Sequence, residues 1–154
     1  MSGKDASVHA TRRIKKGTVY IFEDSACLLC IDRGDRIVLV RQFREPLARE
    51  TLELPGGNIQ QGESALEAAL REFEEETALP KPSTASLLFS LDLDLSTSIH
   101  RTHVFRARLD QDVDPASQDL PLIVLTKDDA IQAVRTGSIS HAPTVAAILS
   151  EALA

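Results

Sequence analysis

The segment between residues 64 and 82 constrains the fold most, because it predicts a helix with an unusual charge. Ser64 followed three residues later by Glu67 has the spacing of a capping box, in which each residue satisfies a backbone amide of the other. Apolar residues then recur at helical spacing, and Pro80 and Pro82 follow as stop signals. Four glutamates fall within five successive positions: Glu72, Glu74, Glu75 and Glu76. Each like-charge pair one turn apart costs a helix about 0.2–0.5 kcal/mol, so helix stability does not explain the cluster.

Three of these glutamates, at positions 72, 75 and 76, stand at i, i+3 and i+4. This spacing places their carboxylates on one face of the helix, within reach of a shared point. Mg²⁺ and Mn²⁺ take oxygen ligands, and Mg²⁺ commonly bridges carboxylates to the phosphates of a substrate. A divalent cation would therefore turn the repulsion into attraction. The alternative is a solvated acidic face, and the residues around the helix decide between the two.

A longer motif surrounds the helix, from residue 57 to residue 79. Gly57 is followed after five residues by Glu63 and, after seven more, by Arg71-Glu72-Phe73; one residue then leads to Glu75-Glu76, and another to Ala78-Leu79. The pattern closely resembles the Nudix box, G-x5-E-x7-R-E-U-x-E-E-x-G-U, where U is apolar. Eight of its nine specified positions match, including every charged one. The exception is Ala78, where the family has the glycine that closes the helix, so the departure concerns the C-terminal cap and not the glutamates.

The resemblance implies an α+β fold, a Nudix-type α/β/α sandwich with a mixed β-sheet, in which residues 1–154 form a single domain. It implies hydrolysis of a nucleoside diphosphate linked to another moiety, with Mg²⁺ or Mn²⁺ as cofactor. The metal ligands would be Glu72, Glu75, Glu76 and the carbonyl of Gly56, and the catalytic set would be Glu75, Glu76, Arg71 and Glu63. Arg71 would orient the glutamates, and Glu63 would support the site or bind metal weakly. Glu67 lies four residues before Arg71 and is a candidate partner for it.

The flanks of the box resemble those of ADP-ribose pyrophosphatases. The stretch "VLVRQFREPLARETLELPGG" precedes the box, and the tail contains "AIQAVRTGSISHAPTVAAIL". This likeness implies hydrolysis of ADP-ribose or a related nucleotide sugar to AMP and a sugar phosphate. Arg41 and Arg44 would face the pyrophosphate or stabilise the loop beneath it, because guanidinium groups suit phosphate oxygens; alternatively they form ordinary surface ion pairs. Glu53 would support the site beside Gly56, or is a paired strand residue.

Two other functions stay open. One is a Nudix hydrolase of another nucleoside diphosphate derivative, such as GDP-mannose, a dinucleoside polyphosphate or an oxidised nucleotide. The other is a sensor that holds a nucleotide sugar without cleaving it. Such sensors tend to lose box glutamates, and this chain keeps them all. The intact charged set therefore favours catalysis.

Part of the site is not specified by the motif. The general base could come from the loop "DQDVDPASQD", which offers Asp112, Asp114 and Asp119, or from a box glutamate, or the metal alone could ionise the water. His100 stands where the ADP-ribose pyrophosphatase subgroup has an acid. His100 and His103 are candidate pocket residues, although lone histidines are more often structural or exposed. The base-stacking candidates are Tyr20, Phe22 and Phe43.

Composition narrows the class of protein further. The net charge of −6 argues against nucleic acid as a partner, and the basic cluster at residues 12–16 is expected to be a solvated segment. No apolar run approaches the roughly 20 residues that a membrane span needs, and the first residues show no secretory signal. We therefore expect a cytoplasmic protein without a membrane partner. Cys27 and Cys30 lie in an apolar run with no second Cys/His pair, so we expect two buried reduced thiols and not a metal or redox site.

Apolar runs of strand length predict most of the sheet. They cover residues 18–22, 26–31, 36–43, 50–54, 85–95, 102–109 and 122–125, and helices are expected at 126–134 and 142–153. The turn "DRGD" predicts a β-hairpin between the second and third runs. ADP-ribose pyrophosphatases are usually homodimers whose N-terminal strands reach the partner's site, so we expect residues 17–31 at a dimer interface. The alternative is that these strands pack within one chain.

Overall fold

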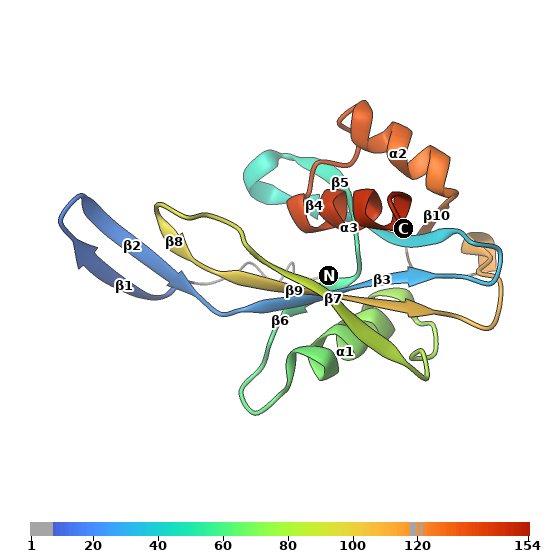
Figure 1. Ribbon diagram of the computed structural model, residues 1–154, viewed down its shortest axis with the longest axis horizontal. Coiled ribbons are helices and arrows are strands. Elements are labelled where there is room, and N and C mark those ends of the chain that lie inside the picture. Colours follow the sequence, from blue (N-terminus) through green and yellow to red (C-terminus); the bar gives the residue numbers. More distant parts are fainter. Residues whose placement is uncertain (1–7, 118–119, 121) are drawn as a thin grey trace.

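The computed structural model describes residues 8–117, 120 and 122–154. A seven-stranded mixed sheet forms its centre, with the strand order β10-β4-β3-β9-β7, while β5 pairs with β4 and β6 with β3. The pair β3–β9 is parallel and the other pairs of this sheet are antiparallel. Helix α1 covers one face, and α2 and α3 cover the other (Figure 1). The predicted α/β/α sandwich with a mixed sheet is confirmed.

Where the sequence shows apolar runs, the bounds of the strands follow them closely. The strands are β1 Val8–Ile14, β2 Gly17–Phe22, β3 Ser25–Ile31, β4 Ile37–Arg44, β5 Arg49–Glu53, β6 Gly56–Asn58, β7 Ala85–Asp92, β8 Ser98–Ile99, β9 Arg101–Arg108 and β10 Leu122–Leu125. The helices are α1 Ala65–Thr77, α2 Lys127–Arg135 and α3 Ala142–Ala152, with short 3₁₀ turns at Glu45–Leu47 and Pro115–Ser117. Among the described residues, no helix is long and apolar enough to cross a bilayer.

Strand β3 lies at the centre of the core, because it is buried on both faces. Leu28 packs on the α1 side, whereas Leu29 packs on the side of α2 and α3. Cys27 and Cys30 are buried on opposite faces of this strand and are not joined by a disulfide. Burial raises the pKa of each thiol to about 12. The expected pair of buried reduced thiols is confirmed.

The predicted hairpin joins β3 to β4, and it fixes one end of the sheet. Ile31 pairs with Ile37 across the turn. The carboxylate of Asp32 accepts hydrogen bonds from the backbone amides of Arg36 and Val113 and from the Arg36 guanidinium. The hairpin turn and the loop after β9 are therefore held together at this end, away from the start of β3.

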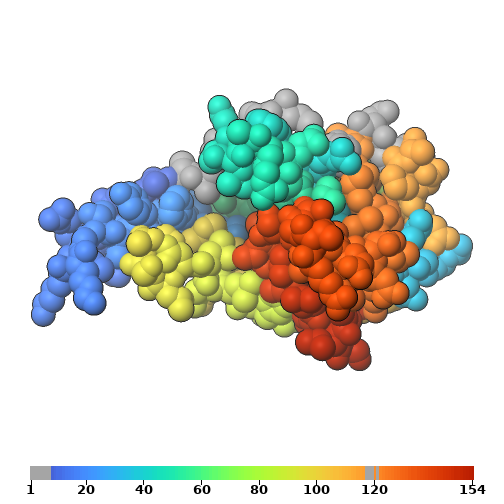
Figure 2. Space-filling model, turned by 90° about the horizontal axis from the view of Figure 1, so that it is seen from above, coloured from blue at the N-terminus to red at the C-terminus, as the bar shows by residue number. Residues whose placement is uncertain are grey.

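Strands β1, β2 and β8 form a separate three-stranded sheet, which we call the arm. It extends from one end of the body (Figures 1 and 2). Every residue of β1 is exposed, including Arg12 and Arg13, so the basic cluster is solvated as expected, but part of it is a strand that the sequence did not predict. Strand β3 belongs to the core of the chain. Within residues 17–31, the exposed residues therefore lie in β2, at Gly17 and Tyr20, and just after it, at Glu23 and Asp24.

Candidate metal and pyrophosphate site

Helix α1 begins as predicted, and this settles the role of one glutamate. The Ser64 hydroxyl accepts a hydrogen bond from the Glu67 amide, and the Glu67 carboxylate accepts one from the Ser64 amide at 2.8 Å. The prediction that Glu67 pairs with Arg71 is wrong, because this capping box engages its carboxylate. Ala69 and Phe73 on the same helix are buried against the sheet, which fixes the rotation of α1 about its axis.

Arg71 joins the glutamates of the box to one another. Its Nε and Nη2 donate to the two carboxylate oxygens of Glu63 at 2.8 and 3.0 Å. Its Nη1 donates to Glu72 Oε1 and lies 3.5 Å from Glu75 Oε2, and Nη2 also donates to the Asn58 carbonyl. The hydrogen bond to Glu63, followed by the contacts with Glu72, raises the pKa of Arg71 above its ordinary value. These contacts agree with the orienting role of Arg71 and the supporting role of Glu63 that the family resemblance implies.

Gly57, the first residue of the box, and Gly56 before it bring the backbone close to neighbouring groups. A Cβ atom added to Gly57 would lie 2.6 Å from the Glu72 carboxylate carbon. A Cβ atom added to Gly56 would lie 2.5 Å from the Cβ of Cys27 and 2.6 Å from the Ala26 carbonyl oxygen. Gly57 therefore leaves room for the carboxylate of Glu72, and Gly56 lets β6 pack directly on β3.

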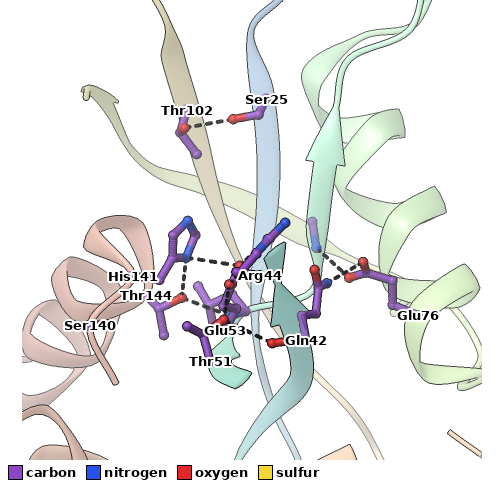
Figure 3. Close-up of polar contacts among 12 residues, drawn as sticks. Ser25, Gln42, Arg44, Thr51, Glu53, Glu76, Thr102, Ser140, His141 and Thr144 are labelled. Carbon is purple, nitrogen blue, oxygen red and sulfur yellow. Dashed lines mark hydrogen bonds and ion pairs between the residues drawn. The ribbon is translucent and has the colours of Figure 1, made fainter. Parts of the chain in front are cut away.

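Glu76 is held at the opposite edge of the same helical face. Its carboxylate accepts hydrogen bonds from the Gly56 amide at 3.0 Å and from Gln42 Nε2 at 2.7 Å (Figure 3). Burial raises the pKa of Glu76 to about 7, and the charge of Glu72 acts in the same direction. A nearby cation would favour the ionised form of this carboxylate.

The residues of this face fit a hard divalent cation by their chemistry. The carboxylate oxygens come from Glu72, Glu75 and Glu76. The Gly56 carbonyl belongs to the residue just before Gly57, whose backbone lies against the Glu72 carboxylate. Mg²⁺ and Mn²⁺ prefer oxygen ligands of both kinds. In the part of the chain that the structure describes, no three His, Cys, Asp or Glu side chains converge as a ready metal cage. Glu72 contacts Arg71, Glu76 contacts Gly56, and the side chain of Glu75 is 50% exposed.

The two arginines predicted to face the pyrophosphate lie on different faces of the β4–β5 hairpin. Residues 41 and 44 of one strand point to opposite sides, since side chains alternate. Arg44 Nε donates to Glu53 Oε1 at 2.8 Å and lies on the same face as Gln42, which contacts Glu76. Arg41 is 45% exposed and lies 3.6 Å from Glu50 Oε2. The structure therefore brings Arg44, and not Arg41, to the side of Glu76.

Glu53 is a buried support for this arrangement (Figure 3). Its carboxylate accepts two hydrogen bonds from Arg44 and one from the Thr51 hydroxyl. Burial opposes ionisation, but the Arg44 hydrogen bonds, the nearby His141 and Thr51 together hold the pKa of Glu53 below its ordinary value. Both roles offered by the sequence fit this geometry, because Glu53 is a strand residue paired with Arg44 and also precedes the segment that leads to Gly56.

Two of the three aspartates considered as general base are remote from the glutamates. Asp112 accepts a hydrogen bond from Arg33 at the β3–β4 turn, and Asp114 accepts one from the amide of Ala116. Gly56, at the glutamate end of β3, pairs with Cys27, whereas Asp32 lies at the turn, five residues further along. At a strand rise of about 3.3 Å per residue, the two ends are roughly 16 Å apart. The Val113 amide, which donates to Asp32, holds the loop of Asp112 and Asp114 at this far end of β3, so the structure brings neither candidate beside the glutamates. Asp119 lies outside the described residues.

The candidate pocket residues gather where the arm meets the body. His100 Nε2 lies 3.2 Å from the Ser25 hydroxyl, which lies 2.8 Å from the Thr102 hydroxyl, and the rings of His100 and Phe22 are 5.8 Å apart. A cavity of about 420 Å³ is nearby, and its lining residues are Asp24, Asp92, Asp94, Leu95, Ser98, Ile99, His100 and Arg101. None of the box glutamates lines this cavity. His103 contacts Ser90 beside it.

Three residues that contact the site were missed by the sequence reasoning. Gln42 donates to Glu76, while at the start of α3 Thr144 accepts from the Leu54 amide and His141 lies near Glu53, in the segment that leads to Gly56. Only Gln42 had a usable signal, because it shares a strand face with Arg44. The contacts of Thr144 depend on tertiary packing.

A mixed sheet that carries a glutamate-bearing helix, with an arginine bridging its carboxylates and paired glycines beside them, defines a Nudix-type hydrolase. The chain belongs to this family, since the family model for the NUDIX domain matches residues 22–147.

The sequence of this chain is similar to that of known ADP-ribose pyrophosphatases. It is 34% identical over 143 residues to the ADP-ribose pyrophosphatase of Bacillus subtilis (strain 168), with 83% of this chain and 73% of that protein covered. It is 31% identical over 142 residues to the methanol dehydrogenase activator of Bacillus methanolicus, with 84% and 74% covered. A solved structure described as an ADP compounds hydrolase superposes with a TM-score of 0.70 at 17% identity, covering 91% of this chain and 80% of the other, and supports the fold.

Proposed function

We propose that the chain hydrolyses the pyrophosphate bond of ADP-ribose or a related nucleotide sugar, giving AMP and a sugar phosphate, in a reaction that depends on Mg²⁺ or Mn²⁺. The observation that carries this proposal is the glutamate face of α1. All three carboxylates are retained, Arg71 bridges to Glu63 and Glu72, and Gly57 leaves the space that Glu72 occupies. A sensor that binds without cleaving has no need of this complete set.

The chemistry follows from the charge of the substrate. Water adds to one phosphorus of the pyrophosphate, the bond from that phosphorus to the bridging oxygen breaks, and two phosphate monoesters leave. The bound cation would neutralise phosphate charge and lower the pKa of the attacking water. Glu72 and Glu76 are enclosed and accept hydrogen bonds from protein donors, and Glu75, 3.5 Å from the Arg71 guanidinium, is the half-exposed carboxylate of the three. We therefore assign the proton from water to a box glutamate, with Glu75 as the first candidate.

The substrate assignment rests on the flanks of the box and on the B. subtilis relative. Two relatives of nearly equal identity carry different names, so overall similarity does not select the substrate. Arg44 is a candidate contact for an anionic ligand, because Glu53 holds it on the side of Glu76 and 34% of its side chain stays exposed. A related nucleoside diphosphate compound, such as GDP-mannose or a dinucleoside polyphosphate, is the second candidate.

A panel of ADP-ribose, other nucleotide sugars and dinucleotides, incubated with Mg²⁺ or Mn²⁺ and resolved by product chromatography, tests the proposal. ADP-ribose should give AMP and ribose 5-phosphate. Glu75→Gln and Glu76→Gln should each lower kcat by about 10²-fold or more, as expected when a metal site loses a ligand or its orientation. Glu74→Gln is the matched control, because Glu74 lies on the same helix but pairs with Lys81.

The outcomes separate the candidates. Cleavage of GDP-mannose or a dinucleoside polyphosphate with ADP-ribose untouched would select the second substrate class. Near-wild-type turnover in Glu75→Gln or Glu76→Gln would remove the metal-site assignment. Binding of ADP-ribose without turnover would identify a sensor.

We also propose that the chain is a homodimer built through the arm. The arm projects from the body, and its apolar side chains Val8, Ile14, Tyr20 and Ile99 are between 43 and 48% exposed. Apolar strands left at an open edge tend to pair with another chain. The proposed interface therefore keeps β2 from the expected range of residues 17–31, leaves out the buried β3, and adds β1 and β8 beside β2.

A further inference from the structure

The turn that joins β5 to β6 is held by three different elements at three successive residues. The Leu54 amide donates to the Thr144 hydroxyl of α3 at 2.9 Å, and the Pro55 carbonyl accepts from the Leu28 amide of β3 at 3.0 Å. The Gly56 amide donates to Glu76 of α1. The turn therefore links the start of α3 to the glutamate face on the other side of the sheet.

Thr144 occupies a position that only a small hydroxyl residue can fill in this way. It is fully buried in the first turn of α3, and Leu54 is 2% exposed. Its Oγ1 accepts the Leu54 amide and lies 2.9 Å from His141 Nδ1. With the hydroxyl oxygen occupied by the amide, its hydrogen is available to a ring nitrogen of His141. Without the hydroxyl, the buried Leu54 amide would lose its acceptor, which is unfavourable.

His141 orients this hydroxyl. It is the N-cap residue of α3, but its side chain makes no cap hydrogen bond to the helix backbone and contacts Thr144 instead. Its Nδ1 also lies 3.8 Å from Glu53 Oε2, in the residue next to Leu54 (Figure 3). Burial lowers the pKa of His141, which favours the neutral ring, and a neutral ring can accept a hydrogen bond from the Thr144 hydroxyl. The end of β5 is thus fixed by Arg44 through Glu53 and by His141 through Thr144.

We propose that Thr144, oriented by His141, is a positioning residue that fixes the Leu54–Gly56 turn so that Gly56 meets Glu76. This inference rests on the proposed function. Thr144 does not contact the glutamates, and it acts through the backbone of the turn. The Gly56 carbonyl, a proposed ligand of the cation, belongs to the same short segment. A shift of that segment would therefore change both the amide that binds Glu76 and the candidate carbonyl ligand.

The test compares Thr144→Val, which keeps the size and removes the hydroxyl, with Thr144→Ser, which keeps the hydroxyl. Mn²⁺ affinity is measured by calorimetry without nucleotide, and kcat and KM are measured with the best substrate of the wild-type protein. We expect Thr144→Val to weaken Mn²⁺ binding and lower kcat by about 10–100-fold, the usual effect of losing an outer partner of a metal site. KM should change little, because Thr144 is buried. Thr144→Ser should restore both values.

A second variant and a second readout keep the inference testable if Thr144→Val folds poorly. His141→Ala removes a side chain that is 33% exposed, and it should change Mn²⁺ affinity and kcat in the same direction by a smaller factor. Hydrogen exchange of the peptide that covers residues 52–57 should be faster in both variants. A lower melting temperature with unchanged Mn²⁺ affinity and kcat would show a purely structural role and overturn the inference. A wild-type protein that neither binds Mn²⁺ nor hydrolyses any nucleotide would instead overturn the proposed function.

Discussion

Gly57 shows how one missing side chain shapes the site. Its backbone lies against the carboxylate of Glu72, which is 3% exposed and paired with Arg71. Because that carboxylate is enclosed, it has little space to move away from a side chain at position 57. The glycine at the start of the motif is therefore explained by contact with the first glutamate of the helical face, and not by a turn that needs positive φ.

Gly57→Ala should damage the site while leaving the fold in place. The added methyl would sit 2.6 Å from the Glu72 carboxylate and force it to move. We expect Mn²⁺ affinity and kcat to fall by about 10–100-fold. Gly34→Ala is the control, since its new Cβ would meet the end of the Asp112 side chain at 3.1 Å at the far end of the sheet. Equal activity in both variants, measured by steady-state kinetics and calorimetry, would contradict this explanation.

Among the individual residues, the sequence predicted correctly which side chains share a face when they lie on the same helix. Glu72, Glu75 and Glu76 share a face because helical spacing requires it. The same rule failed for Glu67, since a capping box competed with Arg71 for its carboxylate. Gln42 had a local signal, the strand face that it shares with Arg44, but its partner lies 34 positions away; Thr144 had none, and its partner lies 90 positions away.

Helix α1 ends at the one position where its motif departs from the family pattern. Ala78 adopts the left-handed conformation, with φ 55° and ψ 14°, and its amide donates to the Glu74 carbonyl. The alanine therefore closes the helix in the conformation that glycine favours. A left-handed conformation costs an L-residue roughly 1–2 kcal/mol.

Ala78→Gly should raise the free energy of unfolding by about 1 kcal/mol, because relief of the left-handed strain exceeds the extra entropy of glycine in the unfolded chain. Urea denaturation measures the change. Ala146→Gly, in the interior of α3, should have the opposite effect and lower the free energy of unfolding by about 0.5–1 kcal/mol. Destabilisation by both substitutions would show that Ala78 is not strained.

Helix α3 is attached to the sheet by a buried carboxylate whose ionisation makes stability depend on pH. Glu151 is 5% exposed and contacts Arg106 of β9 and Lys127 of α2. The Arg106 hydrogen bonds, with Lys127, lower the pKa of Glu151 to about 2 from an ordinary value of 4.5. A carboxyl with a lowered folded-state pKa stabilises the fold above its unfolded pKa, and this contribution is lost as the pH falls through the folded value.

Glu151→Gln should therefore lower the free energy of unfolding near neutral pH and reduce its dependence on pH between about 4.5 and 2. Urea unfolding at a series of pH values measures the difference between variant and wild type across this window. Glu74→Gln, at an exposed pair with Lys81, should change the free energy of unfolding little. If the free energy of unfolding changed with pH in the same way in wild type and Glu151→Gln, the Arg106–Glu151 pair would be excluded as the source of its pH dependence.

Among the elements, burial decided which ones the sequence predicted. Strands β3, β4 and β9 carry apolar runs because they are enclosed by helices, and their positions were predicted within one or two residues. Strand β1 reads VHATRRI and is exposed throughout, so no apolar pattern marks it. Its strand conformation depends on antiparallel pairing with β2, and that of β8 on parallel pairing with β2.

The whole molecule divides into a body with two buried cores and an arm with few buried side chains. Val19 is the buried hydrophobic residue of β2, whereas Tyr20 on the same strand and Ile99 on β8 are exposed. The hydrogen bond from the Tyr20 amide to the Thr97 carbonyl holds the arm strands together, but it adds no apolar burial. An isolated sheet of this size is poorly stabilised in water without a packed face. A second copy of the chain could supply that face.

Light scattering at micromolar concentration should accordingly give a mass near twice the 16.8 kDa of one chain. A stable dimer buries roughly 1,200–2,000 Å² and excludes charge from the centre of its interface. Tyr20→Asp should therefore shift the mass toward one chain, whereas Leu153→Asp, at an 89% exposed residue at the end of α3, should not. A wild-type mass near 16.8 kDa would exclude the dimer, and with it any contribution of the arm to a neighbouring site. Dissociation by Leu153→Asp but not by Tyr20→Asp would instead move the interface to α3.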